Sequence, residues 1–193
     1  MKLLDAHRIG LREFDQAVHQ VEPGQWDAPT PCTGWTVRDL VNHLVSEQLW
    51  APHLLGGATL AEVGDRYDGD VLGADPVAAW ESSSTAAREA WTAPGATERR
   101  VHLSFGESDA EDYGWQMIAD LAVHGWDLAV AIGAVQPIRD DLADTVLRVI
   151  APQVPTWQGI GIFEPPVPVA GDAPPADHLV ALLGRDPGLA RRR

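Results

Sequence analysis

Two carboxylates and an imidazole recur along one predicted helix at a spacing that suits metal binding. Asp120, His124 and Asp127 are separated by four and then three residues, so their side chains fall on one stripe of an α-helix. Apolar side chains share this stripe, namely Met117, Leu121, Leu128 and Ala131. The stripe should therefore face the protein interior, where unpaired polar groups are costly to bury. A bound divalent metal would offset that cost.

A metal at this stripe needs a further ligand from elsewhere in the chain. His43, on the edge of the apolar face of another predicted helix, is the best candidate. Spacing alone leaves a second interpretation open, in which His124 is a core histidine hydrogen-bonded to a carboxylate with no metal present. On spacing alone, this second interpretation carries more weight.

Composition and charge narrow the class of protein. The chain has 193 residues, of which 45% are hydrophobic and eight are tryptophan, which predicts one well-packed domain spanning residues 1–193. Its formal net charge is −14, so its surface should repel the phosphate backbones of nucleic acids. We therefore expect a small-molecule substrate and no nucleic-acid partner. The sequence leaves open whether the protein is a monomer or a homodimer.

The N-terminal residues carry charges that interrupt any apolar run, and no stretch approaches the roughly 18 apolar residues of a membrane span. We therefore expect a cytoplasmic protein with no membrane partner.

Cys32 is the single cysteine, so an internal disulfide and a cysteine-rich zinc site are excluded. Two interpretations of Cys32 remain, a nucleophile or a small buried hydrophobe, and the second is favoured.

Apolar periodicity predicts an all-α fold, an up-down four-helix bundle. The bundle helices are expected over about 4–21, from residue 37 after a capping box at Thr36 and Asp39, from Asp75 to about residue 91, and over Ala110–Ile132. A fifth helix is expected over Arg139–Ile150. Residues 100–105 alternate as a short extended segment, the Pro/Gly-rich residues 152–175 should wrap the bundle, and a short helix should follow over 177–183.

Three sequence motifs together resemble the DinB-like superfamily. They are Pro-Thr-Pro-Cys-Thr-Gly-Trp-Thr-Val-Arg-Asp-Leu-Val-Asn-His-Leu at 29–44, His-Gly-Trp-Asp-Leu-Ala at 124–129, and Leu-Leu-Gly-Arg-Asp-Pro at 182–187. The closest branch is that of small actinobacterial metal-binding proteins related to the N-terminal domain of mycothiol-dependent maleylpyruvate isomerase. The resemblance covers nearly the whole chain and makes metal binding the favoured interpretation.

This resemblance implies a four-helix bundle that holds one divalent metal through His43, Asp120 and His124. Many isomerase-type relatives have Glu where this chain has Asp120, and the shorter side chain reaches about one methylene less. Asp127 matches the aspartate of the family's His-x-Trp-Asp pattern, and we interpret it as a residue that supports a ligand. Zinc is the expected metal, with nickel, iron and manganese as alternatives, and mycothiol is the implied cosubstrate.

The implied chemistry is that of a thiol-dependent transferase or isomerase acting on a small electrophile, because three protein ligands leave one coordination position open. Glu47, one turn from His43, is a candidate general base, although an exposed helix-face glutamate is the more frequent case.

The isomerase has an additional C-terminal domain that this chain is too short to contain, so maleylpyruvate isomerase activity is not implied. The alternatives are a metal-dependent hydrolase and a non-catalytic metal-binding or stress-response module. Trp35, Trp50, Trp115 and Trp126 are candidates to line a pocket.

Overall fold

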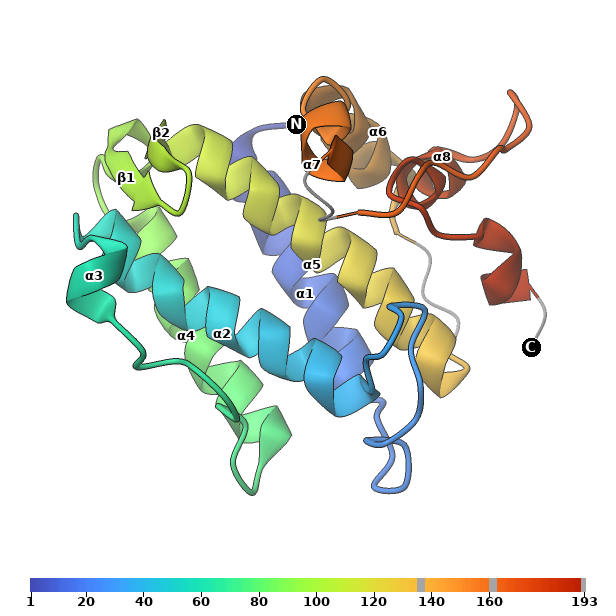
Figure 1. The fold of residues 1–193 in the computed structure, drawn as a ribbon, viewed down its shortest axis with the longest axis horizontal. Helices are drawn as coiled ribbons and strands as arrows, with labels where there is room; N and C mark the ends of the chain where they lie inside the picture. Colours follow the sequence, from blue (N-terminus) through green and yellow to red (C-terminus); the bar gives the residue numbers. More distant parts are fainter. Residues whose placement is uncertain (135–137, 160–162, 192–193) are drawn as a thin grey trace.

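The computed structural model describes residues 1–134, 138–159 and 163–191. Its main body is a bundle of four long helices (Figure 1), which confirms the predicted all-α fold. These are α1 (Leu3–Val18), α2 (Val37–Leu55), α4 (Pro76–Thr92) and α5 (Ala110–Ile132). Each of the four helices packs against two of the others. Helices α1 and α2 each contact both α4 and α5. The expected pairing of the His43 helix with the His124 helix is therefore present.

The helices do not alternate strictly in direction along the chain. Leu3 meets Gly114 and Phe14 meets Gly125, so α1 and α5 run parallel. Arg38 at the start of α2 hydrogen-bonds Asp70 just before α4, so α2 and α4 also start at the same end of the bundle. The connection over residues 56–75, which contains the short helix α3 (Leu60–Val63), runs back along the bundle and makes this possible (Figure 1).

Capping residues fix the ends of the helices that carry the candidate site. Thr36 and Asp39 form the predicted capping box at the start of α2, where each side chain accepts a backbone N–H of the other residue. Asp75 caps α4 by accepting the N–H of Ala78, as predicted. Gly133 ends α5 in the left-handed conformation that favours glycine. These local signals are the reason that the predicted bounds of α5 agree with the structure.

Helix α5 lies at the centre of the molecule and is buried along nearly its whole length. Helices α1, α2 and α6 (Asp140–Ile150) all pack on it. Next to α6 lies α8 (Pro175–Leu182), and the chain ends in a 3-10 helix, η2 (Pro187–Arg191). A short helix, α7 (Val154–Gly159), lies inside the segment that the sequence predicted only as a Pro/Gly-rich wrap.

A β-hairpin lies between α4 and α5. After a 3-10 turn, η1 (Ala96–Glu98), strand β1 (Arg100–Leu103) pairs antiparallel with β2 (Gly106–Asp109), with Val101 opposite Ser108. The sequence predicted the first strand from its alternation but missed β2, because Gly-Glu-Ser-Asp offers no apolar alternation. Within the described ranges, no helix combines the length and the apolar character needed to cross a membrane.

Close packing of α1 on α5 predicts different outcomes for two glycine substitutions in α5. A Cβ at Gly114 would lie 2.8 Å from Leu3 Cδ1 and 3.0 Å from the ring of Trp91, whereas a Cβ at Gly125 would lie 3.9 Å from its nearest neighbour in Phe14. We expect Gly125→Ala to stabilise the protein by about 0.5–1 kcal/mol through helix propensity, and Gly114→Ala to destabilise it by about 1 kcal/mol or more through overpacking. Urea unfolding followed by tryptophan fluorescence measures both, and equal effects would contradict this account of the α1–α5 contact.

Candidate metal centre

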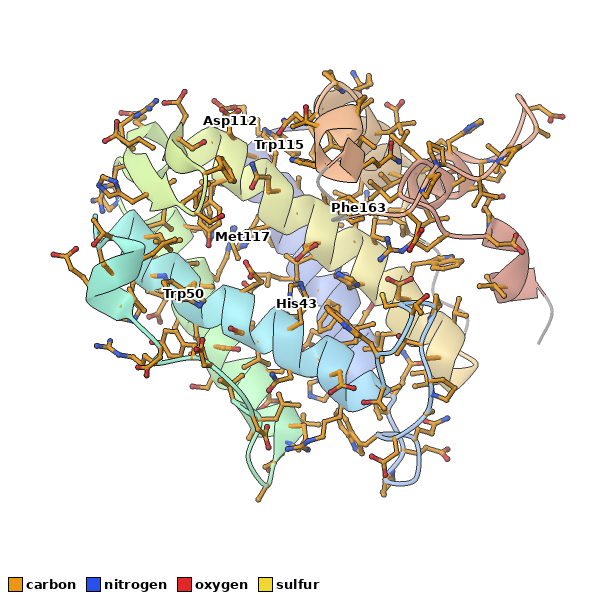
Figure 2. The ribbon with its side chains drawn as sticks, viewed as in Figure 1. His43, Trp50, Asp112, Trp115, Met117 and Phe163 are labelled. Atoms are coloured by element: carbon orange, nitrogen blue, oxygen red, sulfur yellow. The ribbon has the colours of Figure 1, made fainter. Side chains whose placement is uncertain are left out.

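Three side chains predicted to hold a metal converge between α2 and α5. Nε2 of His43 lies 2.9 Å from Oδ2 of Asp120, and Nε2 of His124 lies 3.6 Å from Oδ1 of the same carboxylate. One ligand atom from each of the three residues lies within 4.8 Å of the others. Figure 2 shows His43 on the side of α2 that faces α5. The structure thus brings together residues that are 77 positions apart in the chain.

Asp127 sets the orientation and the tautomer of His124. Its Oδ2 lies 3.0 Å from Nδ1 of His124, and a carboxylate can only accept a hydrogen bond, so Nδ1 carries the proton. Nε2 of a neutral His124 therefore presents its lone pair toward Asp120. A histidine that binds a metal through one nitrogen and donates from the other to a carboxylate has this arrangement.

The donor set fits a divalent metal. With metal–ligand bonds of about 2.0–2.2 Å, tetrahedral ligand atoms lie about 3.4 Å apart, close to the 2.9 and 3.6 Å separations at Asp120. In neutral His124, two acceptors face each other, the Nε2 lone pair and the Asp120 carboxylate, and a shared cation would satisfy both. Two imidazoles and one carboxylate are ligands that zinc and similar ions accept, and they leave a fourth position open.

A second cluster, formed by Cys32, His124 and Asp127, also brings three ligand atoms within 4.8 Å of one another. It is a poorer cation site because a guanidinium already lies in it. Nη2 of Arg185 lies 2.9 Å from Oδ2 of Asp127 and 3.4 Å from Sγ of Cys32. The positive charge of Arg185 would repel a metal there. His43, Asp120 and His124 are therefore the set better able to hold a metal.

Arg185 is a residue of the candidate site that the sequence analysis did not single out. Its Nε lies 3.3 Å and its Nη2 2.9 Å from the two carboxylate oxygens of Asp127, which is completely buried. Burial alone would raise the pKa of Asp127, but hydrogen bonds from His124 and the charge of Arg185 lower it. Arg185 lies in the Leu-Leu-Gly-Arg-Asp-Pro motif at 182–187. No spacing rule connects it to Asp127, its partner 58 residues earlier in the chain.

Opposing effects set the charge state of the pair formed by His43 and Asp120. Burial disfavours the imidazolium of His43, but the adjacent Asp120 carboxylate outweighs it and raises the pKa. Burial likewise would raise the pKa of Asp120, but the charges of His43 and His124 hold it at about 2. Asp120 is therefore ionised at neutral pH, as a metal ligand must be.

Glu47 does not sit on an exposed helix face, and the expectation of an ordinary surface glutamate is wrong. It lies one turn after His43, is half-buried and lines the same cavity as the candidate ligands. Burial, followed by the nearby Asp120 carboxylate, raises the pKa of Glu47 to about 7. Glu47 does not belong to the cluster of possible ligand atoms. Its position suits a group that takes and returns protons near neutral pH.

A cavity of about 980 Å³ opens over the candidate ligands. Of the four tryptophans considered from the sequence, Trp35 lines this cavity, with its ring centroid 5.1 Å from that of His43 and 5.8 Å from that of His124. Trp115 and Trp126 are buried in the hydrophobic core, and Trp50 packs on Tyr67 at a centroid distance of 6.0 Å. The far wall comes from the C-terminal segment, including Phe163 (Figure 2).

Cys32 lines the cavity as a half-buried thiol and not as a fully buried hydrophobe. Its Sγ donates to Oδ2 of Asp127 at 3.2 Å. Burial and the Asp127 charge raise the pKa of Cys32 to about 12. Because the thiolate is the nucleophilic form, this environment disfavours Cys32 as the nucleophile.

Comparisons with known proteins identify the family of this chain. Residues 7–129 match the family described as the mycothiol maleylpyruvate isomerase N-terminal domain. This range includes all three candidate ligands, Asp127 and Glu47, but not Arg185. Uncharacterized proteins of two strains of Mycobacterium tuberculosis are each 33% identical to this chain over 191 residues, covering 96% of this chain and 98% of their own length.

Two crystal structures of the mycothiol-dependent maleylpyruvate isomerase share the fold. A mutant form superposes with a TM-score of 0.64 at 20% identity, and it covers 83% of this chain and 73% of that one. A second structure of the isomerase gives a TM-score of 0.62 at 19% identity with the same coverage. At this level of identity, the likeness concerns the fold alone.

The balance of effects at His43 predicts the outcome of removing the Asp120 charge. In metal-free Asp120→Asn, desolvation remains while the main source of attraction is lost, so the pKa of His43 should fall below its ordinary value of about 6.5. Titration of the imidazole NMR signals measures this pKa. His19, on the surface beside Glu81, provides an internal control whose pKa should not change. A pKa of His43 that is unaffected by the substitution would show that the contact with Asp120 is absent in solution.

Proposed function

We propose that this chain, which belongs to the mycothiol maleylpyruvate isomerase N-terminal domain family, holds one divalent metal at His43, Asp120 and His124 and uses a low-molecular-weight thiol to act on a small electrophile. The observation that carries the proposal is the convergence of these three donor groups at the floor of a cavity of about 980 Å³. Zinc is the metal we expect, and mycothiol is the thiol suggested by the family.

A metal at an open site of this kind lowers the pKa of a thiol or water at its free position. The protein's own groups would do the rest. Glu47, with a pKa raised to about 7, accepts the thiol proton and can return it later in the reaction. Asp127 keeps the Nε2 lone pair of His124 directed at the site, and the Trp35 ring packs against both imidazoles.

Metal content tests the proposed ligand set. We expect about one divalent metal per chain, and His124→Ala or His43→Ala should remove most of it because two ligands remain. Asp127→Asn should weaken metal affinity by only about 10–100-fold, because Asp127 orients the ligand His124 and does not itself bind the metal. Binding should also weaken below about pH 6, where imidazoles become protonated.

Elemental analysis and competition with a chelator measure this stoichiometry and affinity. His53→Ala, on the same helix but hydrogen-bonded to Tyr67, is the matched control and should retain the metal. Full stoichiometry and affinity in His43→Ala would refute the ligand set. Equal losses in His124→Ala and Asp127→Asn would make Asp127 itself a ligand.

Activity tests the proposed reaction. The metal-loaded protein should consume mycothiol together with a small electrophile, and turnover should require both metal and thiol. Glu47→Gln should keep the metal but lower the rate constant by about 10²-fold, the usual worth of a positioned proton acceptor. The assay follows loss of thiol and formation of the adduct or isomer.

The competing functions give different results in this assay. Turnover with metal but without thiol would identify a hydrolase and contradict the thiol-dependent proposal. Rates identical to those of the metal-free His43→Ala protein, across the electrophile panel, would leave a non-catalytic metal-binding module as the function.

A further inference from the structure

Each helix of the four-helix bundle carries one buried polar side chain with an atom that has no hydrogen-bond partner among the described residues. These side chains are His7 in α1, Gln48 in α2, Trp91 in α4 and Tyr113 in α5. The atoms are Nε2 of His7, both polar atoms of the Gln48 amide, Nε1 of Trp91 and the Tyr113 hydroxyl oxygen. Each of the four residues is at most 4% exposed. Leaving such atoms unpaired in the interior would be costly.

Three of these side chains are neighbours. The ring centroids of His7 and Trp91 lie 5.7 Å apart, and those of Trp91 and Tyr113 lie 5.6 Å apart. The indole of Trp91 also approaches α5 closely, because a Cβ at Gly114 would lie 3.0 Å from it. The unpartnered atoms of α1, α4 and α5 therefore share one region of the bundle interior.

Gln48 faces the same region from α2. It lies one turn from Leu44 and one turn from Ala51, both fully buried, so it is on the inward face of its helix. Helices α2 and α4 pack side by side and start at the same end of the bundle. Gln48 and Ala87 are equally far from the first residues of these two helices. Gln48 is therefore at the level of Ala87, one turn from Trp91.

The apolar core is divided at this level into two clusters of buried residues. Along α2, Val45 belongs to one cluster and Ala51 to the other, on either side of Gln48. Along α4, the change occurs around buried Ser83, whose hydroxyl donates to the carbonyl oxygen of Trp80 at 3.1 Å and can still accept. We name the groups at this level the polar layer, which consists of His7, Gln48, Ser83, Trp91 and Tyr113.

The protonation of the polar layer shows what can satisfy it. Nη1 of Arg88 lies 3.4 Å from Nδ1 of His7. Because a guanidinium can only donate, Nδ1 accepts, and Nε2 carries the proton of the neutral ring. Burial, followed by the charge of Arg88, lowers the pKa of His7 to about 3, so the ring is neutral at pH 7. Nε2 of His7 and Nε1 of Trp91 can therefore only donate, whereas Gln48 and Tyr113 can donate and accept.

Water fits this set of donors and acceptors better than other occupants do. A metal ion needs lone pairs, but two of the side chains direct N–H bonds into the layer. An apolar group would leave the donors unpaired. An anion would bring a charge among neutral groups, and Arg88 beside them already donates to the carbonyl oxygen of Leu4 at 3.0 Å. A water molecule both accepts and donates, and buried waters typically bridge polar groups of this kind.

We propose that the polar layer is an internal hydration site, in which ordered water molecules link His7, Gln48 and Trp91 and reach the Tyr113 hydroxyl. Tyr113 also lines the cavity over the candidate metal ligands, so the water cluster extends to the wall of that cavity. The hydration site lies inside the bundle and requires neither a metal nor a thiol.

Contacts between water and the Trp91 indole test the hydration site in the unsubstituted protein. The nuclear Overhauser effect between water and Nε1–H of Trp91 should have the sign of long-lived bound water, and the Gln48 side-chain amide should show the same effect. Trp80 is the matched control, because its buried indole N–H already donates to Oδ1 of Asp15 at 3.0 Å. The absence of this effect at both Trp91 and Gln48 would overturn the proposal.

Gln48→Met measures how much of the water cluster depends on the amide. Methionine has a similar length but removes the donor and the strong acceptor, so about one or two bridging waters should lose their partners and leave. Oxygen-17 relaxation dispersion counts long-lived waters, and this count should fall. Gln20→Met, at an exposed glutamine that bonds its own helix, is the control and should leave the count unchanged. An unchanged count in folded Gln48→Met would contradict the hydration site.

His7→Phe is a second variant in case Gln48→Met does not fold. Phenylalanine keeps the aromatic contact with Trp91 but lacks Nε2–H, so the number of long-lived waters should again fall by about one. Cooperative urea unfolding shows whether each variant is folded. A high-resolution crystal structure provides the direct view. Ordered waters within hydrogen-bond distance of His7, Gln48 and Trp91 would support the proposal, and direct bonds among these side chains without water would overturn it.

Discussion

The buried carboxylate of Asp127 is the interaction on which the rest of the site depends. It accepts hydrogen bonds from Nδ1 of His124, from the guanidinium of Arg185 and from the thiol of Cys32. A fully buried carboxylate is tolerated only when it is paired and hydrogen-bonded. This requirement joins the segments that carry Cys32 and Arg185 to α5. The same bonds fix the ring of His124, and thereby the direction of the nitrogen that faces Asp120 and His43.

The bundle places this carboxylate and the candidate ligands by close helix packing. Glycines in α5 let α1 run alongside it in parallel, with Gly114 against Leu3 and Gly125 against Phe14. Helix α2 then lies on a neighbouring face of α5 and presents His43 to Asp120. Because α5 is buried along nearly its whole length, its polar residues have little freedom to move away from their partners.

The cavity combines a wall from the family domain with a wall from outside it. The matched range, residues 7–129, contributes the candidate ligands, Glu47 and Tyr113. The C-terminal segment contributes Trp157, Phe163 and Arg185. Arg185 lies 5.6 Å from the centroid of the Phe163 ring, so the residue that pairs with Asp127 also helps to position the aromatic wall. Part of the cavity lining therefore comes from a segment that the family match does not cover.

The sequence by itself determined the four long helices and α6, because these depend on short-range patterns, whereas the proposed ligand set came from the resemblance to a family. The capping box at Thr36 and the glycine after Ile132 bound their helices, and the Asp120–His124 spacing placed two side chains on one stripe. Local patterns carry no information on pairs distant in the chain. Only the tertiary structure decided that α2 and α4 start at the same end, that Arg185 pairs with Asp127, and that Glu47 is half-buried beside Asp120. Desolvation and long-range charge pairing arise from packing, and packing exists only once the chain has folded.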